Sequence, residues 1–175
     1  ADNSNIAAYS TDGITWTQTT LPADKYWGFV VYGGGKFVAA TAANEISAYS
    51  TDGVTWVQAQ IPSGNWAAGA YGNDGYGNGI FVTGYDGGPG ALYSYDGITW
   101  EKVEKKDSHF GCIAYGNGEF VALSDAIVFH SADGAEWKDT YSVKGILKGD
   151  GEGNLLAAEA GVDYLSPAGG TIPAS

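Results

Sequence analysis

Short apolar runs alternate with glycine- and asparagine-rich turns along almost the whole chain. Residues 27–32 and 36–40 form one such pair, separated by three glycines at 33–35. Similar pairs follow at 66–71 and 80–83, 110–115 and 119–123, and 143–147 and 154–158. Two apolar runs joined by a Gly or Asn turn predict an antiparallel hairpin. The runs are continuously apolar, so we expect strands that are covered on both faces.

A second pattern, Ser-x-Asp-Gly-x-x-Trp, occurs four times between these pairs. Its Asp residues lie at 12, 52, 96 and 133, which are 40, 44 and 37 residues apart. Asp-Gly predicts a tight turn, and the Trp begins a more polar outer strand. A regular spacing of this size indicates one structural unit copied in tandem. We expect a structural role for the repeated residues, because Ser and Asp can bond the turn backbone and Trp can pack between units. They are Ser10, Asp12, Trp16, Ser50, Asp52, Trp56, Ser94, Asp96, Trp100, Ser131, Asp133 and Trp137.

Four antiparallel strands in each unit of roughly 40 residues predict an all-β fold, a β-propeller of four blades. The predicted blades cover residues 26–61, 65–103 and 108–141, and the fourth combines 5–18 with 143–166. Pairing of the N- and C-terminal segments would then close a single domain over 1–166, followed by a linker at 167–175. One feature of the sequence also allows the alternative of a ring with more than four blades. Residues 162–166 resemble the strand at 5–10, so one of the two segments is surplus in a four-bladed ring.

The repeated phrase resembles the Asp-box, also called the bacterial neuraminidase repeat, although it lacks one residue between Asp and Gly. With Tyr in front and a Tyr-Gly-Asn-Gly-x-Phe-Val hairpin between copies, it is similar to repeats of phage tail proteins and secreted bacterial propellers. This resemblance implies a location outside a cell or on a virion surface. For sialidases it also implies an arginine cluster that binds the substrate carboxylate. The chain contains no Arg, and Lys is a poor substitute in bidentate binding, so we exclude sialidase chemistry.

Composition and net charge exclude further classes of binding partner. The 175 residues include 28 glycines and 44% hydrophobic residues, which suits a β protein with many turns and a real core. A net charge of −12 disfavours nucleic acid and anionic membranes. No apolar run approaches the roughly 18 residues that span a bilayer. Cys112 is the one cysteine, and we expect it to be a small buried hydrophobe.

Catalytic and metal sites are weakly indicated. The two histidines, His109 and His130, accompany no nucleophile-elbow motif, and we expect His130 to be packed structure. We predict that the chain is not an enzyme and binds no cofactor. The loops 73–78 and 149–154 carry Asp, Glu and Asn oxygens that could bind Ca²⁺, but Gly and Asn are also expected in such turns.

Function is expected where the repeats differ, because binding residues tend to lie in variable loops on a rigid scaffold. An aromatic residue opens three of the inner hairpins, each preceded by a polar or amphipathic residue, which suits the apolar face and hydroxyl rim of a sugar. The predicted ligand-binding residues are Tyr26, Trp27, Asn65, Trp66, Tyr85, Asp86, His109 and Phe110. The alternative is that these aromatic rings fill the core.

The leading prediction is therefore a non-enzymatic recognition module, extracellular or on a phage tail fibre, that binds a glycan or a cell-surface receptor. A second possibility is an assembly domain that docks other chains of a fibre or surface layer. A glycan hydrolase is the third, and it would need a carboxylate in the variable loops.

Overall fold

The computed structural model describes residues 4–42, 44–85, 90–103, 109–124 and 127–139, together with the strand backbones of 147–149 and 155–157. The predicted all-β class is confirmed, since the described residues form sixteen strands and no helix. The chain divides into two compact units, Ala1–Lys138 and Asp139–Ser175. The single domain over 1–166, with 5–18 paired to 143–166, stays a prediction. Residues 162–166 and 167–175 lie outside the described residues.

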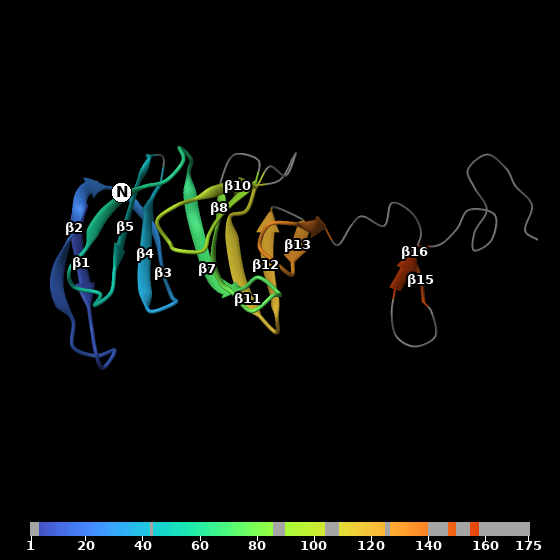
Figure 1. Cartoon of the computed structure of the whole chain (residues 1–175), viewed down its shortest axis with the longest axis horizontal. Helices are drawn as coiled ribbons and strands as arrows, with labels where there is room; N and C mark the ends of the chain where they lie inside the picture. Colours follow the sequence, from blue (N-terminus) through green and yellow to red (C-terminus); the bar gives the residue numbers. More distant parts are fainter. Residues whose placement is uncertain are drawn as a thin grey trace, which may run out of the picture. The chain divides into compact units, whose positions relative to one another are not determined.

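Three four-stranded antiparallel sheets make up most of the first unit (Figure 1). The β3–β6 sheet contains β3 (Trp27–Gly33), β4 (Lys36–Thr41), β5 (Ile46–Ser50) and β6 (Val57–Gln60). The β7–β10 sheet contains β7 (Trp66–Asn73), β8 (Gly79–Tyr85), β9 (Ala91–Ser94) and β10 (Glu101–Val103). The β11–β14 sheet contains β11 (Cys112–Gly116), β12 (Glu119–Ser124), β13 (Ile127–Ser131) and β14 (Lys138–Asp139). In each sheet the strands follow chain order, so each repeat folds as a meander.

Two further pairs of strands stand outside these sheets. At the start of the chain, β1 (Ser4–Tyr9) pairs with β2 (Thr17–Lys25), and the phrase at 10–16 joins them. In the second unit, β15 (Leu147–Gly149) pairs with β16 (Leu155–Ala157). The first pair corresponds to the outer half of a repeat and the second to the inner half.

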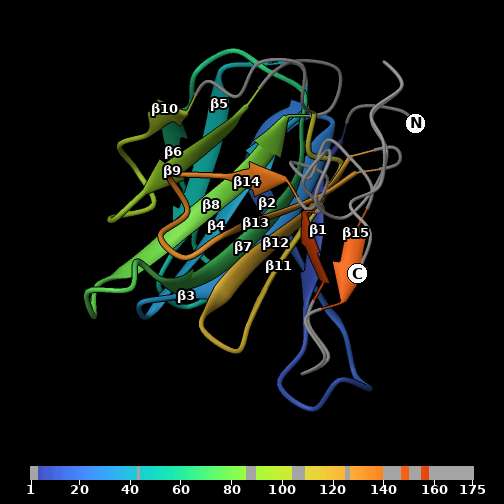
Figure 2. The ribbon, with the colours of Figure 1, turned by 90° about the vertical axis from the view of Figure 1, so that its right-hand side faces the viewer.

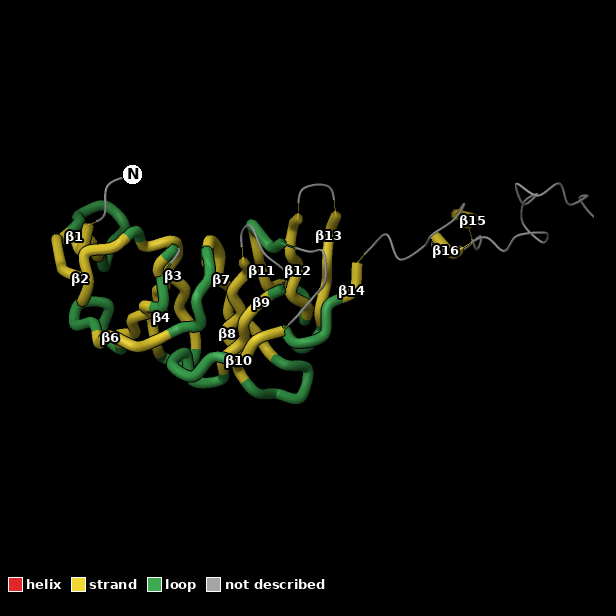
Figure 3. Tube along the Cα trace, turned by 90° about the horizontal axis from the view of Figure 1, so that it is seen from above, coloured by secondary structure: helices red, strands yellow, loops and turns green. Residues whose placement is uncertain are grey.

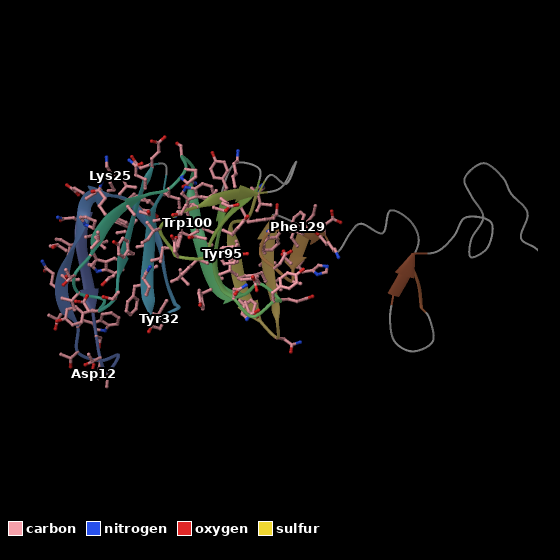
Figure 4. The ribbon with its side chains drawn as sticks, in the orientation of Figure 1. Asp12, Lys25, Tyr32, Tyr95, Trp100 and Phe129 are labelled. Carbon is pink, nitrogen blue, oxygen red and sulfur yellow. The ribbon has the colours of Figure 1, made fainter. Side chains whose placement is uncertain are left out.

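The sheets of the first unit stack face to face. The innermost strand β7 packs between β3 and β11, and the strands of successive sheets overlie one another in Figure 2. Seen from above, the β1–β2 hairpin lies at one end of this row and β13 and β14 lie at the other (Figure 3). Asp12 and Tyr32 lie toward one side of the sheets and Lys25 toward the other (Figure 4). The repeated phrase and the inner hairpin turns therefore share one side.

Glycines allow neighbouring inner strands to approach closely. A Cβ added to Gly33 would lie 1.9 Å from Cγ of Tyr71, and a Cβ added to Gly72 would lie 2.2 Å from the Tyr115 ring. Each of these tyrosines thus covers a glycine at, or one residue before, the end of the first strand of the preceding sheet. The rule repeats because Tyr-Gly recurs at the same place in successive repeats.

The expectation that Cys112 is buried is wrong, because its side chain is exposed. In β11, the side chain of Ile113 points toward the β7–β10 sheet and is buried. Successive side chains of a strand point to opposite faces, so Cys112 lies on the face turned away from β7.

Candidate functional site

The repeated phrase forms the same closed network of hydrogen bonds in every copy. In the second copy, the Ser50 hydroxyl donates to Oδ1 of Asp52 at 2.9 Å. The same oxygen accepts the N–H groups of Val54 and Thr55 at 2.8 and 2.7 Å. The N–H of Gly53 donates to Ser50 Oγ, and its φ of 73° lies in the left-handed region that suits glycine. The Ser and Asp side chains are used within the turn, which leaves them little capacity for a ligand.

Electrostatics agree with this structural role. Hydrogen bonds from the N–H groups of Thr55 and Val54, and then from Ser50, lower the pKa of Asp52 to about 2. Burial raises the pKa of Asp96, but the N–H groups of Thr99 and Ile98 outweigh it and bring the value to about 2. The pKa values of the equivalent Asp12 and Asp133 are also lowered. A carboxylate held ionised in this way is a poor general acid.

Two of the predicted ligand-binding aromatics lie in the core. Trp66 is 2% exposed, donates its indole N–H to the carbonyl of Pro62 at 2.8 Å, and packs on Tyr85 with ring centroids 5.1 Å apart. Phe110 is fully buried against Phe129 and Trp137. The structure corrects the prediction of ligand contact for Trp66 and Phe110, because a neighbouring sheet covers both rings.

The other predicted residues stay at least partly accessible, but several also join the sheets. The carbonyl of Tyr26 accepts the N–H of Ala42, and the carbonyl of Tyr85 accepts the N–H of Phe110. Asn65 forms an isolated bridge with Ala42. Tyr26 is 48% exposed, whereas Trp27, Asn65, Tyr85 and His109 are partly buried. Asp86 lies outside the described residues.

The Ca²⁺ candidate loop at 73–78 is organised by its own hydrogen bonds. Oδ1 of Asp74 accepts the N–H groups of Tyr76 and Asn78, and Oδ2 accepts the Asn78 amide at 2.8 Å. Asn73 Oδ1 accepts the N–H groups of Gly75 and Gly77. Within the described part of the chain, no group of three or more His, Cys, Asp or Glu residues could hold a metal ion. Of the other candidate loop, residues 150–154 lie outside the described residues.

A groove of about 680 Å³ lies between the outer part of the β3–β6 sheet and residues 98–100 of the third phrase, which precede β10. We call it the inter-sheet groove. Tyr49 and Trp100 provide its aromatic surfaces, and the exposed Gln58, Gln60 and Glu45 provide amides and a carboxylate. Trp100 is labelled in Figure 4. The remaining lining residues are Ala59, Ile61, Pro62, Ile98 and Thr99.

The equivalent junction between the β7–β10 and β11–β14 sheets is filled. There, Trp137 is 5% exposed and its indole N–H donates to the Gly134 carbonyl at 3.1 Å. Trp100 occupies the same place in the preceding repeat but is only partly buried, and its indole N–H has no acceptor among the described residues. The Trp of the repeated phrase is therefore buried and hydrogen-bonded at one junction, whereas at the other it forms part of the groove wall.

Sequence reasoning missed the groove because Gln58 and Gln60 look like ordinary residues of a polar outer strand. One signal was available. The strand after the second phrase is Val-Gln-Ala-Gln, whereas the strand after the third is Glu-Lys-Val. Neutral amides at alternate positions of an outer strand place two hydrogen-bonding groups on one face.

Comparison with known proteins shows a fold but no family. No protein-family model matches the chain, and no curated protein matches it. Among solved structures, it resembles selenomethionine-substituted virginiamycin B lyase from Staphylococcus aureus, with a TM-score of 0.61 and 10% identity. The match covers 77% of this chain and 48% of that one, so the chain spans about half the length of the structure it matches. The architecture is all-β and propeller-like.

This comparison also overturns the prediction that the chain is not an enzyme, since the similar fold is that of a lyase. At 10% identity the likeness shows the fold alone and identifies no reaction. Among the described residues, no helix is long and apolar enough to cross a membrane.

Proposed function

We propose that this chain is a recognition module that binds a glycan in the inter-sheet groove. The observation that carries this proposal is the contrast between two equivalent junctions, one closed by Trp137 and one open beside Trp100. A site that departs from the repeated frame is a better candidate than a residue shared by all repeats.

The lining chemistry supports a sugar as the ligand. Aromatic rings such as Trp100 and Tyr49 can stack on the C–H face of a pyranose, and the side chains of Gln58, Gln60 and Glu45 can bond its hydroxyl groups. A volume of about 680 Å³ lies within the range of small-molecule sites. The net charge of −12 and the Glu45 carboxylate favour neutral or amino sugars over acidic ones.

A glycan array, followed by calorimetry with the best neutral oligosaccharide, tests this proposal. We expect Gln58→Ala and Trp100→Ala to weaken binding at least tenfold. Gln18→Ala is the matched control, because Gln18 is exposed and occupies the position of Gln58 in the strand after the first phrase. Tyr26→Ala tests the surface predicted from sequence. If binding is lost in Tyr26→Ala but unchanged in both groove variants, the proposal that the glycan binds in the inter-sheet groove is wrong.

Protein docking is a second candidate, favoured by the position of β6 at the edge of its sheet. Val57 in β6 is 48% exposed, and an edge strand presents unpaired backbone groups to an added strand. A negative glycan array together with a stable complex with a neighbouring fibre chain would favour this function. Display outside a cell or on a phage tail fibre stays a proposal from the repeat resemblance.

We also propose that residues 143–166 complete the sheet begun by residues 5–18, which gives four blades per chain. The proposal is supported by the β1–β2 and β15–β16 hairpins, which correspond to the outer and inner halves of one repeat. Closing an array in this way removes exposed sheet edges.

A further inference from the structure

We infer that a small cavity on the outer part of the β7–β10 sheet is a second ligand site, which binds a quaternary ammonium group between two tyrosine rings. We call this cavity of about 200 Å³ the tyrosine cage. Its residues lie in the third phrase and at the start of β10. The residues that line it are Tyr93, Ser94, Tyr95, Asp96, Thr99 and Glu101. The inference goes beyond the proposed glycan site and does not depend on it.

Two residues of the tyrosine cage depart from the repeated frame. The position of Tyr95 holds a small residue in the other three copies, namely Thr11, Thr51 and Ala132. The position of Glu101 holds no acidic residue in the other copies, where it is Thr17, Val57 and Lys138. Ligand-binding residues tend to lie where a common scaffold varies. Two departures that meet in one cavity therefore indicate a site and not a general requirement of the blade.

The two tyrosine rings form a corner. Their centroids are 5.9 Å apart and their planes are inclined by 80°. The Tyr93 hydroxyl donates to Oε2 of Glu101 at 2.5 Å, and the two residues are cross-strand neighbours, which holds the Tyr93 ring in place. Tyr95, labelled in Figure 4, is 56% exposed, so its ring does not serve to fill the core. A cation in this corner would lie within about 6 Å of both ring centroids, which is the range of a cation–π contact.

Negative charge surrounds the two rings. Asp96 and Glu101 line the cavity itself. Burial raises the pKa of the Tyr95 hydroxyl, and the charges of Asp74, Asp133 and Glu101 raise it further. A field that opposes the formation of a tyrosinate anion also attracts a cation to the same place.

Two neighbouring segments contribute to this field. Asp74 comes from the loop at 73–78, which is longer than the inner hairpin turns of the β3–β6 and β11–β14 sheets and is a third departure from the repeat. Lys36 donates to the Asp96 carbonyl at 2.6 Å and lies against the Tyr49 ring, but it does not line the cage. The four carboxylates outweigh this one ammonium group, so the cage favours a positively charged ligand.

Hydrogen bonding favours a quaternary over a primary ammonium group. Oδ1 of Asp96 accepts the Ser94 hydroxyl and the N–H groups of Ile98 and Thr99, and Oδ2 accepts the Thr99 hydroxyl. A primary ammonium group is strongly hydrated and needs acceptors for three N–H groups. A quaternary ammonium group has no N–H group and binds through its charge and its contact with aromatic faces. The cavity is also smaller than a usual site for a whole drug-sized ligand, which suits a single head group.

An NMR titration of the tyrosine ring signals with choline tests this inference. We expect a saturable shift with choline. The neutral isostere, in which a tert-butyl group replaces the trimethylammonium group, should bind at least about tenfold more weakly, because it has the same shape without the charge. Ethanolamine should also bind more weakly than choline, because its primary ammonium group is more strongly hydrated. Added salt should weaken choline binding at this partly exposed site.

Variants locate the binding within the cage. Tyr95→Thr introduces the residue of the first two copies, so we expect it to fold and to weaken choline binding at least about tenfold. Glu101→Gln keeps an acceptor for Tyr93 but removes the charge, and it should weaken binding about threefold or more. Tyr76→Thr is the matched control, because Tyr76 is 89% exposed on the neighbouring loop and does not line the cage. Gln58→Ala, in the inter-sheet groove, should leave choline binding unchanged, which separates this site from the proposed glycan site.

Two larger probes identify where the quaternary ammonium group comes from. One is phosphocholine, which represents a lipid or glycan head group, and the other is a peptide that contains trimethyl-lysine. We expect the peptide to bind more tightly, because the phosphate of phosphocholine would meet the charges of Asp96 and Glu101. Tighter binding of phosphocholine would support the same cage and assign it to a head group.

Three results would overturn the inference. Equal binding of choline and its neutral isostere would show an apolar contact without recognition of charge. Unchanged choline binding in Tyr95→Thr would place the binding outside the cage. The third result is the absence of a saturable shift with every trimethylammonium probe in a chain whose circular dichroism shows the folded β structure.

Discussion

The two complete junctions of the first unit differ although they are built from the same repeat. Between β7–β10 and β11–β14, the rings of Phe110 and Trp137 lie 4.8 Å apart within a closed apolar cluster. Between β3–β6 and β7–β10, Trp66 is equally buried, but Trp100 borders the inter-sheet groove. The phrase therefore specifies the turn and the position of its Trp, while the packing between the two sheets determines whether that Trp is covered.

The largest expected effect is at the closed junction. Trp137→Ala should lower the free energy of unfolding by about 3–5 kcal/mol, because it removes a buried ring and leaves a cavity. Trp100→Ala should cost about 1–2 kcal/mol, because part of that ring already faces solvent. Urea unfolding followed by circular dichroism measures both. Equal losses in the two variants would contradict the difference between the junctions.

The close approach of the inner strands predicts the next largest effect. Gly72→Ala should cost about 1–3 kcal/mol, because its Cβ would overlap the Tyr115 ring and force the two sheets apart. Gly111→Ala is the control, since a Cβ at Gly111 would meet no atom within 4 Å. We expect the control to change the free energy of unfolding by less than about 0.5 kcal/mol. A neutral Gly72→Ala would show that the Tyr-over-Gly contact does not set the spacing of the sheets.

The repeated turns at the two junctions should respond to low pH in the same way. Each Asp has a folded-state pKa below its ordinary value of 3.8, about 2 for Asp52 and Asp96. Their stabilising contribution is therefore complete above pH 3.8 and is lost as the pH falls toward 2. Urea midpoints across this range should fall less steeply in Asp96→Asn and in Asp133→Asn than in the unmodified chain. If the dependence of the urea midpoint on pH changes in only one of the two variants, the two turns do not contribute equally to stability.

The sequence predicts the strands and turns well because their causes are local. Asp-Gly and Ser-x-Asp bond within a few residues, so the order of the residues alone locates the four turns. The sequence alone does not show that Trp66 and Phe110 are buried, because the burial of an aromatic side chain at this position depends on how the neighbouring sheet packs. The sequence does not predict the inter-sheet groove either, because the groove also depends on packing between sheets. Gln58 and Trp100 are far apart in sequence, and their distance is set by how two sheets pack.

Lys36 offers the smallest and most local test of why one junction is open. Its Nζ donates to the Asp96 carbonyl at 2.6 Å and lies 5.3 Å from the centre of the Tyr49 ring. At the closed junction, the equivalent position is Ile80, which is fully buried beside the turn at Gly134. A polar link thus bridges the open junction where an aliphatic contact fills the closed one.

Replacing Lys36 should therefore separate the two kinds of contact. Lys36→Met should cost about 0.5–1 kcal/mol, because it removes one hydrogen bond and the contact of a cation with an aromatic ring. Lys36→Ile should cost less, since a branched side chain can pack on the turn at Gly97 as Ile80 does at Gly134. Lys138→Met, on the exposed outer strand β14, controls for the loss of a positive charge. If Lys36→Ile proves less stable than Lys36→Met, the open junction cannot accept the packing of the closed one, and the groove is fixed by more than this single residue.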